Sequence, residues 1–121
     1  MILNLTQHPA SAEQVEAGVV DLQGADLMKL KKELNFDFLP TKRELSTSAS
    51  EIVDLAIRNS EEDDTVMIGG APFFMPYLVL ELKMCDRNPV FAFSVRESVE
   101  KEIDGKVVKT SVFKHLGFVE V

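Results

Sequence analysis

The residues best suited to chemistry follow three apolar segments of the chain, which we expect to be strands. They are Thr6, Gln7 and His8 after the first segment, Gly69 and Gly70 after the second, and Ser94, Arg96 and Ser98 at the end of the third. In open parallel sheets, ligands bind beyond the carboxyl ends of the strands, where the connecting loops gather. If the three strands are parallel and adjacent, all of these residues share one edge of the sheet.

The pair Gly69-Gly70 precedes Ala71-Pro72, where we expect a helix to begin. Glycine allows a ligand to approach the backbone closely, and free amides at a helix start attract phosphate. Two glycines satisfy neither the P-loop pattern nor the dinucleotide-binding pattern. A tight strand-to-helix turn with no ligand explains the pair equally well.

Arg96 ends an apolar run between Ser94 and Ser98. A guanidinium group can make paired hydrogen bonds to a phosphate. The competing interpretation is a salt bridge to a nearby carboxylate, which the acidic surplus of the chain favours.

Asp104-Gly105 predicts a two-residue hairpin turn, and this turn sets the register of the segments on either side. Continued towards the body of the protein, the register places Arg96 opposite Phe113 and Ser94 opposite His115. Because side chains alternate along a strand, Ser94, Arg96, Ser98 and His115 then share one face. A bulge near Arg96 would move His115 to the other face.

The only two histidines, His8 and His115, therefore both fall near the expected edge. A histidine there could exchange protons as a catalytic acid or base, although a surface or structural role is the common alternative. Neither histidine has a cysteine or aspartate at ligand spacing, so we expect no metal site and no cofactor. The single cysteine, Cys85, is expected in the core.

Local patterns predict the elements that must position these residues. We expect strands at Met1–Thr6, Thr65–Ile68 and Val90–Val95, with residues 19–22 either a short edge strand or a packed loop. Helices are expected after the capping boxes that begin at Ser11 and Thr41, over Asp26–Leu34, and from Pro72 to Met84. This order predicts one Rossmann-like α/β domain over residues 1–121. Its mostly parallel sheet is flanked by helices and ends in a C-terminal antiparallel β-hairpin.

The composition limits the partners that the chain can have. A formal charge of −7 over 121 residues argues against broad binding of duplex DNA, which needs a basic surface. No apolar run approaches the roughly 20 residues of a membrane span, and no secretory signal is evident, so we expect a cytoplasmic protein. The last helix is apolar nearly all round, which predicts a homodimer contact.

The opening Ile2–Pro9 and the closing Ser111–Phe118 resemble a family of small uncharacterised bacterial and phage proteins. The layout, with His-Pro after the first strand, is also similar to the small Rossmann-like ring nucleases linked to CRISPR systems. That resemblance implies a homodimer that binds cyclic oligoadenylate and cleaves it without metal. The matching loop positions would be His8, Gly69, Gly70, Ser94 and Arg96.

Two hypotheses follow. In the first, the strand-end edge binds a nucleotide or another phosphorylated ligand, with Thr6, Gln7 and Ser94 positioning it and Arg96 neutralising its charge. His8 or His115 would move protons if the ligand is cleaved. In the second, the chain is a non-enzymatic, phage-derived interaction module that docks on a protein through helix 73–85 or the hairpin.

Overall fold

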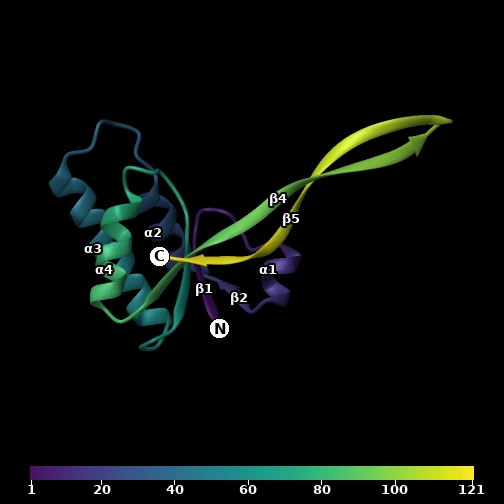
Figure 1. Ribbon diagram of the computed structural model, residues 1–121. Coiled ribbons are helices and arrows are strands. Elements are labelled where there is room, and N and C mark those ends of the chain that lie inside the picture. The colour runs from purple at the N-terminus through teal and green to yellow at the C-terminus, as the bar shows by residue number, and fades with distance from the viewer.

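The structure is a computed structural model that describes residues 1–121, and its centre is a five-stranded sheet, drawn in Figure 1. The strand order is β2-β1-β3-β4-β5, with the first four strands parallel and β5 antiparallel to β4. The strands are β1 (Ile2–Leu5), β2 (Val19–Asp21), β3 (Thr65–Ile68), β4 (Asn88–Ile103) and β5 (Lys106–Glu120). This confirms the expected mostly parallel sheet with a C-terminal antiparallel hairpin, and it makes residues 19–21 an edge strand.

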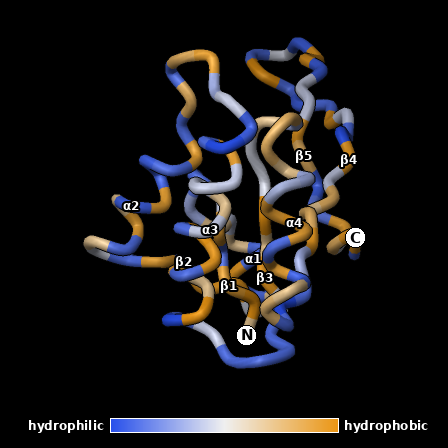
Figure 2. Tube along the Cα trace, turned by 90° about the vertical axis from the view of Figure 1, so that its left-hand side faces the viewer, coloured by the Kyte–Doolittle hydropathy of each residue, from blue (hydrophilic) through white to orange (hydrophobic).

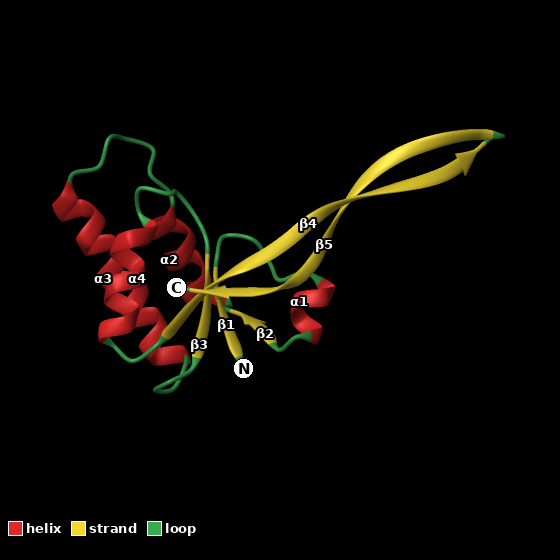
Figure 3. Ribbon diagram, viewed as in Figure 1, coloured by secondary structure: helices red, strands yellow, loops and turns green.

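Helices cover both faces of the sheet unequally. The helices are α1 (Ala12–Glu16), α2 (Gly24–Leu34), α3 (Lys42–Asn59) and α4 (Met75–Met84). Figure 3 shows α2, α3 and α4 on one side of the sheet and the short α1 on the other. Both predicted capping boxes are present, Ser11 with Gln14 before α1 and Thr41 with Glu44 before α3.

The core lies between the sheet and the three larger helices. Leu3 and Leu5 of β1 and Val66 and Ile68 of β3 face this layer, where they belong to a cluster of 17 buried residues. Figure 2 shows β1 and β3 mostly in the hydrophobic colour. Because side chains alternate, the residue between Leu3 and Leu5 must face the other side of the sheet. That residue is Asn4, which becomes important for the site.

The start of α4 differs from the expectation. The helix begins at Met75 rather than Pro72, because residues 71–74 form a turn that buries the Phe74 side chain completely. Pro76 then occupies the first helical turn, where a missing amide has no cost. The free amides of a helix start therefore do not follow the two glycines directly.

The strand predicted at Val90–Val95 also differs, because β4, which contains it, does not end at Val95. It runs without a break to Ile103 and returns as β5 through a turn in which Asp104 and Gly105 both have positive φ, 51° and 76°. The predicted register is confirmed, including the pairs Arg96 with Phe113 and Ser94 with His115. The register shifts only between Phe93 and Ser94, so the irregularity lies on the body side of these pairs.

Beyond the body, β4 and β5 form a long twisted ribbon that projects away from the other elements (Figure 1). We call residues 94–115 the arm. None of its residues is buried, whereas Val90 at the body end of β4 is only 2% exposed. No helix of the protein is both long enough and apolar enough to cross a membrane.

Polar contacts between α2 and α3 brace the helical layer. Asn59 donates to Asp26 at 3.0 Å and Arg58 donates to the other oxygen of the same carboxylate at 3.0 Å. The hydrogen bond from Asn59, followed by that from Arg58, lowers the pKa of Asp26. Lys29 pairs with Glu51 one turn further along the same interface.

The lowered pKa of Asp26 predicts an acid-sensitive contribution to stability. A carboxyl group whose folded pKa is depressed stabilises the fold above its unfolded pKa, and this contribution is lost as the pH falls through the folded pKa. We expect Asp26→Asn to melt below the wild type at pH 6, and the difference to shrink towards pH 3. Thermal denaturation across this range measures it, with Asp54→Asn on the exposed side of α3 as the charge-matched control. A difference that does not change with pH would contradict the prediction.

Candidate functional site

A buried amide shapes the loop that follows β1. Asn4 is 3% exposed and is the only buried polar residue of the chain. Its Oδ1 accepts hydrogen bonds from the Thr6 amide at 2.9 Å and from the Thr6 hydroxyl at 2.7 Å. Its Nδ2 donates to the His8 carbonyl at 2.9 Å and to Asp21 at 2.8 Å. Both ends of one side chain therefore hold the first three residues of the loop.

Asp21 extends the same network to the edge strand. It lies directly opposite Asn4 in the β1–β2 register, and its carboxylate also accepts from the Ala10 amide at 3.1 Å. The segment Thr6–Ala10 is thus fixed at both ends by two neighbouring strands. Neither Asn4 nor Asp21 was predicted as part of the site. The available signal was a polar residue in the middle of an apolar strand, which must find partners if it is buried.

A cavity of about 460 Å³ lies at the carboxyl ends of β1 and β3, beside Phe91 and Ala92 of β4. We call it the rim cavity. Three segments from distant parts of the chain form it, together with Gln14 of α1. Its lining residues are Thr6, Gln7, His8, Pro9, Gln14, Met67, Ile68, Gly69, Gly70, Phe91 and Ala92. The structure therefore brings together five of the predicted residues, those that follow β1 and β3.

A smaller cavity of about 270 Å³ lies on the other side of the same loop. It shares Thr6, Gln7, His8 and Pro9 with the rim cavity and adds Lys31 and Asp21. The loop is therefore a wall between two hollows, and His8 borders both. Lys31 is the only lysine or arginine that lines either of the two cavities.

The rim cavity offers hydrogen-bond donors without a formal charge. The backbone amides of Gln7, His8, Gly69 and Gly70 have no acceptor within the protein. None of the lining residues is a lysine, arginine, aspartate or glutamate. Clustered backbone amides are a common way to hold an anion.

Gly69 and Gly70 differ in the space that is available for a side chain. At Gly70 a Cβ atom would lie 3.3 Å from the Met75 methyl group and 3.6 Å from Leu34, so packing alone favours a small residue. Gly69 does not have a positive φ, and a Cβ there would only touch the Thr6 methyl group at 3.4 Å. The turn does not require glycine at position 69, and the space that it leaves belongs to the cavity.

Ser94, Arg96, Ser98 and His115 lie on the arm and not in the cavity lining. Ala92 lines the cavity, and Ser94 is the next residue on the same face of β4. Arg96 lies over the Phe113 ring, 5.5 Å from its centre, and forms no salt bridge. These four residues therefore lie outside the cavity that the other five line.

His115 lies at the body end of the arm. Its ring meets Phe118 edge to face, with 5.0 Å between centres, and its Nδ1 is buried without a hydrogen-bond partner. Cys85, expected in the core, is half-buried and packs against the main hydrophobic cluster. No group of three or more His, Cys, Asp or Glu side chains is arranged to hold a metal ion.

Comparison with known families places the chain. A family model described as the "Uncharacterized protein MJ1673 family" matches residues 1–119. The chain belongs to this family. Neither the comparison with curated proteins nor the comparison with solved structures gives a match. The family assignment thus covers nearly the whole chain and gives no activity.

The Asn4 network predicts a large loss of stability on substitution. Asn4→Ala would leave the Thr6 amide, the His8 carbonyl and part of Asp21 without their partner inside the protein. We expect a loss of about 3 kcal/mol in the free energy of unfolding, measured by urea denaturation. Asn35→Ala, at an exposed position after α2, should change it by less than about 0.5 kcal/mol. Equal effects of the two substitutions would show that the network does not stabilise the loop.

Proposed function

We propose that this protein binds a nucleotide or another phosphorylated ligand in the rim cavity. One observation supports the proposal above the others. Gln7, His8, Gly69 and Gly70, whose backbone amides have no acceptor within the protein, all line one cavity beyond the ends of parallel strands. Backbone donors at this place in an α/β sheet suit a phosphate group.

The rest of the lining suits the remainder of a nucleotide. Met67, Ile68 and Phe91 provide an apolar side, and Gln7 and Gln14 provide amide groups that can both donate and accept. A volume of about 460 Å³ lies within the usual range for small-molecule sites, roughly 300 to 1,000 Å³. We therefore expect the cavity to take one nucleotide unit at a time.

The catalytic form of the proposal is metal-independent cleavage of a cyclic oligoadenylate, which the resemblance to ring nucleases suggests. The ribose 2′-hydroxyl would attack the neighbouring phosphorus, break the bond to the 5′ oxygen and leave a 2′,3′-cyclic phosphate. The protein needs mainly to align these groups and to stabilise charge on the phosphate oxygens, and the free amides of the cavity residues would serve the second purpose. His8 would accept the proton of the 2′-hydroxyl or donate one to the departing 5′ oxygen.

The alternative function is a non-enzymatic interaction module, and the exposed apolar residues favour it. Phe113 on the arm is 70% exposed, and Leu80 and Met84 on α4 are 61% and 74% exposed. Solvent-exposed side chains of this size commonly mark a protein contact when they lie together. In this case the rim cavity would be an unused hollow, and the protein would bind no nucleotide.

Ligand-dependent melting separates the two functions. We expect adenosine monophosphate or one of the cyclic tri-, tetra- and hexa-adenylates to raise the melting temperature of the wild type. His8→Ala and Gly69→Ala should weaken the binding at least tenfold, while Ser46→Ala on α3 leaves it unchanged. Without ligand, Gly69→Ala should keep its stability to within about 1 kcal/mol, because the added methyl group has room.

Chromatography of the products, with a chelator present, then tests catalysis. A wild type that binds and releases linear products, together with His8→Ala that binds weakly and releases none, supports the catalytic form. No shift with any adenylate, combined with capture of a specific protein, would favour the interaction module instead.

A further inference from the structure

The arm carries a backbone edge that nothing in the protein covers. β3 pairs with β4 only as far as the pair Ile68 with Phe91. Beyond it, β4 runs to Ile103 with β5 on one side and no strand on the other. A two-stranded ribbon is marginal in water, and an open edge is a template for a further strand.

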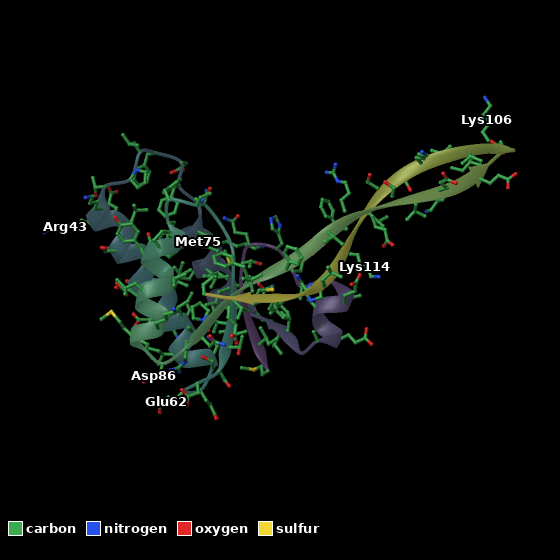
Figure 4. The ribbon with its side chains drawn as sticks, in the orientation of Figure 1. Arg43, Glu62, Met75, Asp86, Lys106 and Lys114 are labelled. Atoms are coloured by element: carbon green, nitrogen blue, oxygen red, sulfur yellow. The ribbon has the colours of Figure 1, made fainter.

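The two edges of the arm differ in their charges. β5, on the outside of the sheet, carries Lys106, Lys109 and Lys114 and no acidic residue before Glu120, so two such edges would repel. Figure 4 shows Lys106 at the tip of the arm and Lys114 nearer to its base. Edge lysines of this kind protect a strand from pairing. The inner edge, on β4, mixes both signs of charge and lacks this protection.

We propose that the free edge of β4 pairs with the same edge of a second copy of this chain, antiparallel and centred on Val99. In this register every position meets a compatible one. Val99 faces its own copy, and the pairs on either side are Ser98 with Glu100, Glu97 with Lys101, Arg96 with Glu102 and Val95 with Ile103. Opposite charges and apolar pairs directly across two strands stabilise their pairing.

Sterics and charge exclude the neighbouring registers. A two-fold axis that relates two antiparallel strands must pass between the two copies of one residue. Each possible register is therefore defined by the residue that faces its own copy. Centring on Ser98 would place Gly105 of the partner subunit opposite Phe91, where Ile68 already pairs. Centring on Glu100 or Lys101 would bring like charges face to face, which is unfavourable. Val99 is the centre that avoids both problems.

The proposed contact also uses the whole free edge. Val95 would lie opposite Ile103 of the partner subunit. The hairpin turn of the partner would then lie just beyond the end of β3, which stops before Gly69. The two ribbons would become one four-stranded sheet, which satisfies the open backbone groups of both. The contact does not depend on the rim cavity, so its failure would leave the proposed ligand site untouched.

A charge exchange tests the contact. Arg96 and Glu102 lie on one strand about 20 Å apart within a copy, so they can influence each other only across two copies. We expect Arg96→Glu and Glu102→Arg each to raise the dissociation constant of the dimer at least tenfold, and the double variant to restore it within about threefold. Sedimentation of the full chain over a range of concentrations measures it.

A crosslink provides the second test. In a Cys85→Ser background, Val99→Cys should form a disulfide-linked dimer on mild oxidation, because the two copies of position 99 face each other. Ser94→Cys is the control, since its two copies would be about 30 Å apart. A wild type that stays monomeric would overturn the proposal. A dimer whose dissociation constant does not respond to the charge exchange would also overturn it, and would point to another face such as α4. The same holds if only a different protein pairs with the edge of β4.

Discussion

The structure depends on one requirement, that the amide of Asn4 be satisfied inside the sheet. An unpaired polar group in a buried strand would cost on the order of 1 to 3 kcal/mol, so its four hydrogen bonds are a condition of the fold. They are also what bends the chain after β1. Because two of the four partners are the Thr6 amide and the His8 carbonyl, the network holds the backbone of the loop, which forms one wall of the rim cavity.

The same arrangement explains why the cavity can be neutral and still suit an anion. The loop and the Gly69-Gly70 segment both leave backbone amides without acceptors, and dipoles held by a rigid frame need no rearrangement when a charged group arrives. The acidic surplus of the chain lies elsewhere, including the run Glu61–Asp64 at the opposite end of β3. The protein thus keeps carboxylates out of the lining in spite of a net charge of −7.

β4 joins the two parts of the molecule. Its first residues complete the sheet beside β3, and its remaining length leaves the body as the arm. A bulge between Phe93 and Ser94 marks the change, and bulges commonly occur where a strand bends or increases its twist. The strand that closes one side of the cavity is therefore also the strand that offers an edge to a second copy.

The sequence by itself determined the features that depend on near neighbours. The capping boxes at Ser11 and Thr41, the buried strand Thr65–Ile68 and the pairing of Ser94 with His115 all follow from short-range rules. A two-residue turn fixes every pair of a hairpin, so that register was predictable to the body of the protein. Only the tertiary structure decided that Arg96 lies away from His8 and Gly70. β4 separates from the sheet where β3 ends. The length of β3 cannot be predicted from the local sequence of β4.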